Sequence, residues 1–144
     1  PDIFPLALEL RHPSWFSGQQ ILPQLVDYLR SRKIGLVMTD VAGRRDVLHS
    51  SISSSFVLLR FIGNNLHPSD KTRAQNWVKR FCDWQHSGLS KLFLFIHEPN
   101  DILVPEMTNY FLNQPSKQGG WDLKPQEAMK EDPQLGLITD QRII

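Results

Sequence analysis

The chain has 144 residues, of which 40% are hydrophobic and 22% are charged, and its formal net charge is +1. This length suits one domain or a piece of one, and the composition is ordinary for a soluble globular protein. The small net charge excludes a global attraction to nucleic acid or membrane, so any such attraction must come from local patches. No apolar run reaches the roughly 18 residues that a membrane-spanning helix needs.

Cysteine content and the first residues suggest where the protein resides. Cys82 is the only cysteine, which excludes an internal disulfide and a cysteine-based zinc cluster. A reducing, cytoplasmic setting is therefore predicted. The start "PDIFPLALEL" lacks the charged segment of a signal peptide. Because Pro1 stands where a Met would be, we expect the natural protein to begin earlier.

The first predicted element is a strand over residues 6–10, because apolar residues alternate there. Its leucines share one face, and Glu9 shares the other face with Arg11. Further along the chain, the patterns predict a helix over 21–33, buried strands over 34–40 and 56–63, a helix from an N-cap at Ser69 to a stop at Gly88, a strand over 91–99, and a short helix that begins at Pro105.

This order of strands and helices indicates an α/β fold with a parallel sheet. Polar residues stand at the end of all four predicted strands, and they are Arg11 and His12, Thr39 and Asp40, Arg60, and His97 and Glu98. Sites of parallel α/β proteins gather at that edge of the sheet. We therefore expect Arg11, Asp40, Arg60 and His97 to converge at one mouth. From residue 116 the composition shifts to Gly, Pro, Lys and Gln, which predicts a loosely packed or disordered extension over 116–144.

Several of these segments carry a family resemblance. The motifs "ELRHPSWF", "VMTD", "LLRFIGN" and "WVKRFCDWQHSGLSKLFLFIHEP" resemble the YecE-like family, which is catalogued as a domain of unknown function. The resemblance covers about residues 6–113 and implies a TIM-barrel-like fold. Since only four strands are present, it implies the C-terminal half of such a barrel over residues 1–115. The chain departs from many members at Ile62, where they carry His, and at Ile96 and His97, where they carry an Asn pair.

Three residues are candidate catalytic groups, and two of them also have a structural alternative. Asp40 follows an apolar strand and is a candidate base, or else a turn residue. His12 is a candidate base or ligand, or else it caps the loop. His97 lies on the same strand face as Phe93 and Phe95. Its position in the family motif implies that it points toward the mouth.

Two charged residues of the first strand and one of the third are candidate substrate ligands. Arg11 would bind an anionic group that Glu9 orients, or the two would form a structural ion pair. Arg60 interrupts the run "FVLLRFIG", and an unpaired buried guanidinium is costly. Arg60 must therefore face either an acidic partner or a water-filled mouth.

Loop residues complete the candidate site. Trp15 could stack on a ring or a sugar, or it could pack the loop onto the barrel. Arg44 and Arg45, beside Gly43, could cradle a phosphate, or they could be solvated surface.

No metal site is predicted, and the sequence leaves any cofactor unknown. Glu9, His12, Asp40, His97 and Glu98 are residue types that bind divalent metals, but no two show a diagnostic short spacing. The Gly-rich motifs of nucleotide-binding proteins are absent.

The first functional hypothesis is an enzyme that acts on an anionic substrate, phosphorylated or derived from nucleic acid, at the C-terminal edge of the strands. The alternative is a non-catalytic protein that uses the same basic mouth to bind a ligand or nucleic acid. Half a barrel leaves sheet edges and an apolar face uncovered, so we expect self-association where the other half is missing.

Overall fold

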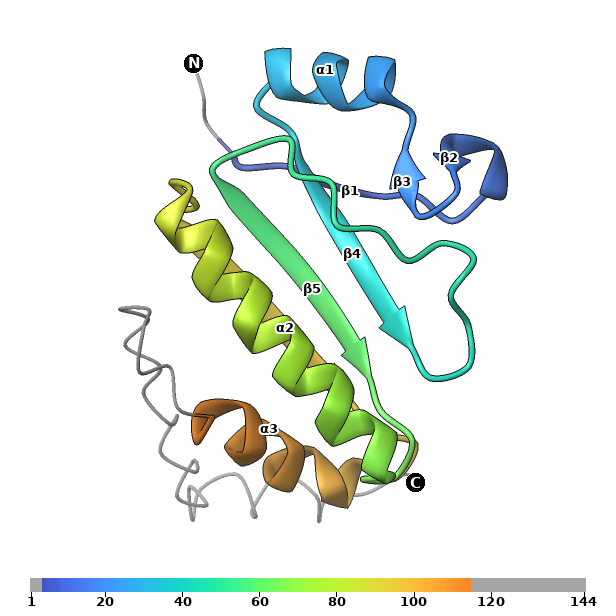
Figure 1. Cartoon of the computed structure of the whole chain (residues 1–144), viewed down its shortest axis with the longest axis vertical. Helices are drawn as coiled ribbons and strands as arrows, with labels where there is room; N and C mark the ends of the chain where they lie inside the picture. Colours follow the sequence, from blue (N-terminus) through green and yellow to red (C-terminus); the bar gives the residue numbers. More distant parts are fainter. Residues whose placement is uncertain (1–3, 115–144) are drawn as a thin grey trace, which may run out of the picture.

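A parallel sheet of four strands, in the order β1-β4-β5-β6, forms the centre of the molecule (Figure 1). The structure is a computed structural model that describes residues 4–114. The elements in chain order are β1 (Ala7–Glu9), the 3-10 helix η1 (Pro13–Trp15), β2 (Phe16–Ser17), β3 (Gln20–Ile21), α1 (Pro23–Ser31), β4 (Gly35–Val41), β5 (Phe56–Ile62), α2 (Pro68–His86), β6 (Lys91–His97), the 3-10 helix η2 (Asp101–Leu103) and α3 (Val104–Leu112). The predicted α/β class and parallel sheet are confirmed.

The parallel register aligns the strand ends. Glu9 pairs with Val37, Thr39 pairs with Arg60, and Arg60 pairs with Phe95. The carboxyl ends of all four strands therefore lie along one edge of the sheet, as the sequence predicted.

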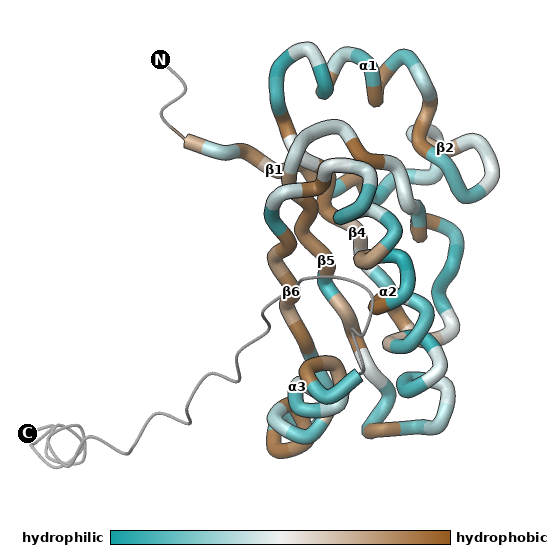
Figure 2. The backbone as a smooth tube through the Cα atoms, turned by 60° about the vertical axis from the view of Figure 1, so that its left-hand side comes forward, coloured by the Kyte–Doolittle hydropathy of each residue, from teal (hydrophilic) through white to brown (hydrophobic). Residues whose placement is uncertain are grey.

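Helices cover one face of this sheet. Their main core contains buried residues of β4, β5, α2 and α3, among them Met38, Leu59, Phe61, Trp77 and Met107. In Figure 2, β5 and β6 are largely hydrophobic, whereas α2 is mostly hydrophilic apart from the residues that it buries. A second core packs α1 against the start of the sheet through residues such as Leu29 and Leu36. Burial of these apolar side chains is the main driving force that packs the helices against the sheet.

Two of the predicted helices begin at other residues than expected. The expected helix over 21–33 begins only at Pro23, because Ile21 pairs with Phe16 in a small antiparallel hairpin, β2–β3. The helix α2 begins at Pro68 instead of after Ser69, because His67 is its N-cap and accepts a hydrogen bond from the backbone N–H of Ser69.

The first strand is shorter and less buried than expected. Leu6 and Leu8 are 61% and 40% exposed, and only Leu10 of the three leucines is buried. The strand lies at the edge of the sheet and pairs only with β4. The predicted extension over 116–144 lies outside the described residues, so its looseness and the boundary at residue 115 stay predictions.

Candidate functional site

The strand residues at the carboxyl edge divide between two faces, because successive side chains of a strand point to opposite sides. Glu9, Thr39, Arg60 and His97 lie on the face that no described helix covers, which we call the open face. Asp40 lies on the face that packs against α2. The predicted single mouth is therefore wrong for Asp40.

Four residues form a polar cluster on the open face, which we call the Glu9 cluster: Glu9, Arg11, Thr39 and Arg60. The Nη1 atom of Arg60 donates to Glu9 Oε1 and Oε2, at 2.9 and 3.0 Å. The Thr39 hydroxyl donates to Glu9 Oε1 at 2.7 Å. Arg11 Nη2 donates to Glu9 Oε2 at 3.0 Å. Both oxygens of one carboxylate therefore hold three side chains from three different elements of the edge.

The charge balance of this cluster is positive. Burial raises the pKa of the Glu9 carboxyl, but hydrogen bonds from Arg11 and Thr39 and the charge of Arg60 outweigh it, so the pKa lies below its usual value. Glu9 is thus ionised at neutral pH, and one negative charge faces two guanidinium groups. Among the described residues, Nη2 and Nε of Arg60 have no hydrogen-bond partner, so this guanidinium retains donors for a further acceptor.

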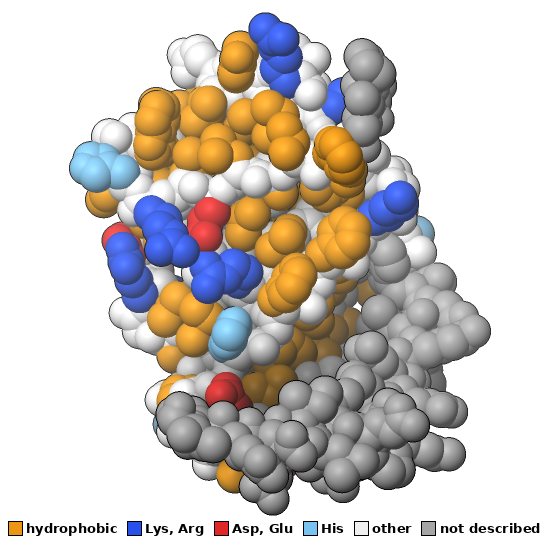
Figure 3. Space-filling view, turned by 180° about the vertical axis from the view of Figure 1, so that it is seen from behind, with side chains coloured by type: hydrophobic (Ala, Val, Ile, Leu, Met, Phe, Trp, Pro, Cys, Tyr) orange, Lys and Arg blue, Asp and Glu red, His pale blue; other side chains and the backbone are white. Residues whose placement is uncertain are grey.

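Apolar side chains surround the Glu9 cluster. Phe93 and Phe95 are 44% and 52% exposed on β6, and Phe95 is paired in register with Arg60. Figure 3 shows this side of the molecule, with basic and acidic side chains set among hydrophobic ones and a histidine nearby. His97 ends β6 on the same face, in register with Ile62, and is exposed. The sequence prediction that His97 follows the face of Phe93 and Phe95 is confirmed.

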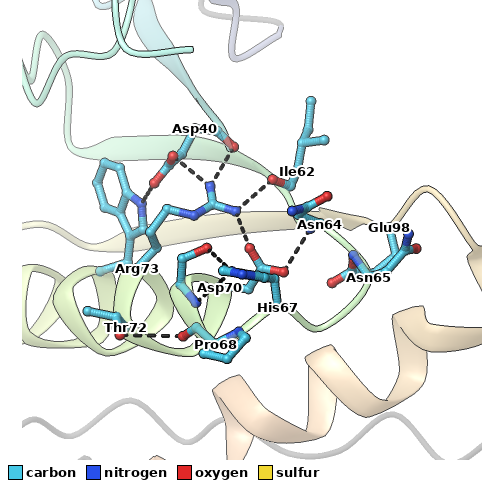
Figure 4. Close-up of polar contacts among 12 residues, drawn as sticks. Asp40, Ile62, Asn64, Asn65, His67, Pro68, Asp70, Thr72, Arg73 and Glu98 are labelled. Carbon is cyan, nitrogen blue, oxygen red and sulfur yellow. Dashed lines mark hydrogen bonds and ion pairs between the residues drawn. The ribbon is translucent and has the colours of Figure 1, made fainter. Parts of the chain in front are cut away.

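Asp40 belongs instead to a buried ionic network that was not predicted. It is 2% exposed, and its Oδ1 accepts hydrogen bonds from Arg45 Nη1 at 2.6 Å and Arg73 Nη1 at 2.7 Å. Its Oδ2 accepts from the indole N–H of Trp77 at 2.6 Å. Arg73 continues the network to Asp70 Oδ1 at 2.8 Å (Figure 4).

This network ties the ends of two strands to the beginning of α2. Arg73 also donates to the backbone carbonyl of Ile62, and Asp70 accepts from the backbone N–H of Asn64. With three donors on its two oxygens, Asp40 is held in one place as an anion. Its geometry is that of a structural carboxylate, and it lies away from the Glu9 cluster.

Sequence reasoning missed Asp70 and Arg73 as partners of Asp40, although a signal was present. Asp70, Arg73 and Trp77 recur at helical spacing on one face of the helix. Two opposite charges on the apolar face of a helix indicate a buried partner in the sheet, because an unpaired buried charge is costly.

The remaining loop candidates lie apart from the Glu9 cluster or are otherwise engaged. His12 caps η1, where its Nδ1 accepts from the backbone N–H of Ser14 at 3.2 Å. Trp15 is 44% exposed within η1. Arg44 forms an ion pair with Asp46, whereas Arg45 forms one with Asp40. The two arginines therefore do not form one phosphate cradle in this structure.

Glu98 is a further buried carboxyl on the helix side. It is 4% exposed, and its Oε2 accepts from the backbone N–H of Asn65 at 2.8 Å. Its Oε1 has no partner among the described residues. Burial and the nearby charge of Asp70 raise the pKa of the Glu98 carboxyl.

No group of three or more His, Cys, Asp and Glu residues within 4–114 is arranged to hold a metal ion. The five candidate metal ligands of the sequence are separated in the structure. Glu9 and His97 lie on the open face, Asp40 and Glu98 lie on the helix side, and His12 caps η1. Across the same residues, no helix has the length and the hydropathy needed to cross a bilayer.

The fold and the polar edge define a class of protein. A parallel sheet with helices on one face, and with polar side chains at its carboxyl edge, is a partial β/α fold of the TIM-barrel type. The chain belongs to the family described as "Protein of unknown function DUF72", whose family model matches residues 1–130. The expected YecE-like membership is thereby confirmed.

Curated relatives are about twice as long as the matched region. The chain is 24% identical over 127 residues to the UPF0759 protein YecE of Escherichia coli K12, and it is equally similar to the protein of that name from E. coli O157:H7. Each match covers 76% of this chain and 46% of the relative. No solved structure matches the chain.

Proposed function

We propose that this chain contributes an anion-binding site to a TIM-barrel-like protein, and that Arg60 is the principal ligand of the anion. The observation that carries the proposal is the partly exposed guanidinium of Arg60, whose side chain is 30% exposed. It is anchored to Glu9 through one nitrogen and keeps its other donors free among the described residues.

The surroundings of Arg60 favour binding over a purely structural role. Glu9 already accepts hydrogen bonds from Arg11 and Thr39, so it does not need Arg60 to be satisfied. The two arginines leave the cluster with one excess positive charge. A charge in a partly desolvated site interacts more strongly with a ligand than one on an open surface. A phosphate or carboxylate group matches the planar donor geometry of a guanidinium.

The substrate class that fits best is a small phosphorylated or nucleic-acid-derived molecule. Phe95 lies beside Arg60 in the sheet and offers an exposed aromatic surface to the non-ionic part of such a ligand. Because the chain spans less than half of the relatives that it matches, the remaining walls of the site belong to this proposal as well.

Catalysis at this edge is a second candidate, and the position of His97 favours it. His97 is exposed on the open face, two residues beyond Phe95 on the same strand. An imidazole there can move a proton to or from a ligand held by Arg60. The shared face of His97 and Arg60 supports this second candidate.

The test is a calorimetric titration of the chain with inorganic phosphate. We expect Arg60→Met to abolish binding while Arg30→Met, which removes an exposed arginine of α1, leaves it unchanged. Unchanged phosphate affinity in the Arg60→Met variant would contradict the proposal. A strong dependence on salt with no preference for small phosphates over oligonucleotides would instead support the nucleic-acid-binding alternative.

A further inference from the structure

The ion pair between Arg60 and Glu9 uses only one nitrogen of the guanidinium. Nη1 of Arg60 donates to both carboxylate oxygens of Glu9, at 2.9 and 3.0 Å. An arginine and a carboxylate that can orient freely commonly form two parallel bonds from two nitrogens. That arrangement would occupy a second nitrogen of Arg60. In this structure Nη2 and Nε of Arg60 have no partner among the described residues, and neither atom is buried.

Two other side chains hold the Glu9 carboxylate in this orientation. The Thr39 hydroxyl donates to Oε1 at 2.7 Å, and Nη2 of Arg11 donates to Oε2 at 3.0 Å. Each oxygen of Glu9 therefore accepts one bond from Arg60 and one from another side chain. The carboxylate can turn toward a second nitrogen of Arg60 only by giving up one of these bonds.

Thr39 is the more rigid of the two anchors. It lies on β4, in register with Arg60 on β5, and β4 is the one strand that pairs with the strand of Glu9. A threonine is branched at Cβ, so its χ1 angle is restricted. The side chain of Arg11 is long and 72% exposed, and holding it in one conformation costs more conformational entropy.

We propose that Thr39 is a positioning residue for the anion that Arg60 binds. Its hydroxyl holds Glu9 in the one-nitrogen pair, and Nη2 and Nε of Arg60 thereby stay available to a phosphate or carboxylate group. Without the hydroxyl, Glu9 turns into a two-nitrogen pair with Arg60 and competes with the ligand for the same donors. This inference rests on the proposed anion site and adds the residue that keeps that site open.

The first test is a calorimetric titration of Thr39→Val with inorganic phosphate. Valine keeps the branched shape and removes the hydroxyl. We expect phosphate to bind about tenfold more weakly, because one charged donor is lost to the ligand. Thr39→Ser keeps the hydroxyl and should restore binding. Thr72→Val is the matched control, since the hydroxyl of Thr72 bonds to the carbonyl of Pro68 within α2.

A double-mutant cycle with Glu9→Gln tests the mechanism. A glutamine side chain has a single acceptor oxygen, so it cannot pair with two nitrogens of Arg60 at once. In the Glu9→Gln background, Thr39→Val should therefore change phosphate affinity by less than about twofold. A tenfold loss in both backgrounds would show that Thr39 acts independently of Glu9, which overturns the proposal.

The third measurement needs no ligand. NMR signals of the Arg60 guanidinium, assigned by their absence in Arg60→Met, report how fast its N–H protons exchange with water. We expect slower exchange in Thr39→Val than in the parent chain or in Thr39→Ser, because a second nitrogen becomes hydrogen bonded. Equal exchange in all three proteins overturns the proposal. A role in stability alone would lower the melting temperature of Thr39→Val and leave this exchange unchanged.

The outcomes distinguish this inference from the proposed function. Unchanged phosphate affinity in Thr39→Val, together with loss of binding in Arg60→Met, overturns the role of Thr39 and leaves the anion site standing. A parent chain that does not bind phosphate contradicts the anion site and this inference together. Weaker binding in Thr39→Val that Thr39→Ser restores, with slower guanidinium exchange, supports both.

Discussion

Arg60 and Glu9 are 51 residues apart in the sequence, yet Arg60 Nη1 lies 2.9 Å from Glu9 Oε1. They come from β5 and β1, which are not neighbours, so the contact passes over β4, where Thr39 adds its hydroxyl to the same carboxylate. One carboxylate thus connects three strands on the open face. This relationship explains why an acid and two arginines occur near the ends of otherwise apolar strands.

Replacing Arg60 with Met should cost little stability. Glu9 keeps its hydrogen bonds to Arg11 and Thr39, and its side chain is 22% exposed, so water can replace the lost donor. We expect the free energy of unfolding to fall by about 1 kcal/mol or less, as for other partly exposed ion pairs. A urea melt measures this change. A loss of several kcal/mol would show that Arg60 serves chiefly to neutralise Glu9.

Replacing Asp40 with Asn should be far more damaging. The change removes the charge that holds Arg45 and Arg73, and Arg73 is itself buried. We expect a loss of about 3 kcal/mol, the lower end of the cost of breaking a buried ion pair, because Arg73 keeps Asp70 as a partner and Arg45 is half exposed. Asp27→Asn is the matched control, since Asp27 pairs with Arg30 on the exposed surface of α1 and its removal should change little. Equal melts for the two variants would contradict the structural role of Asp40.

The Glu98 carboxyl should make stability decrease with rising pH. Its pKa in the folded protein is raised, so the folded state holds the proton more tightly than the unfolded chain does. Stability is therefore highest below the ordinary glutamate pKa of about 4.5, and it decreases as pH rises through the folded-state pKa. In Glu98→Gln this part of the pH dependence should disappear, while the opposite contribution of Glu9, which is lost as pH falls, remains. Urea melts at a series of pH values measure the difference. Identical pH profiles in the variant and the parent chain would contradict the assignment.

The open face should drive self-association of this chain in isolation. Phe93 and Phe95 are exposed there, and the sheet has unpaired edges at β1 and β6 within the described residues. We expect sedimentation equilibrium to detect dimers or larger species at micromolar concentration, and Phe95→Gln to shift them toward monomer. As a control, Tyr28→Gln changes an exposed aromatic residue of α1, on the helix side of the sheet, and should leave association unaltered. A monomeric parent chain would count against this proposal.

The sequence by itself determined the class of fold and the edge of the sheet at which the polar ends of the strands gather. Apolar runs over β4, β5 and β6, with a helical pattern between the last two, indicated a parallel sheet. Strand alternation also placed His97 and Glu98 on opposite faces, since the side-chain period of a strand is two. Arg60 was recognised as needing a partner because a guanidinium among apolar residues is costly.

Only the tertiary structure decided which polar residues meet. Asp40 and Arg60 stand at the ends of neighbouring strands, but the register places Arg60 opposite Thr39, so Asp40 points to the other face. A change of one residue in register exchanges the two faces, and sequence does not specify register between strands that are far apart in the chain. The partners of Asp40 come from α2 and from the loop after β4, whose docking depends on packing of the whole helix face. The β2–β3 hairpin likewise arises from contacts between distant segments, which local patterns do not encode.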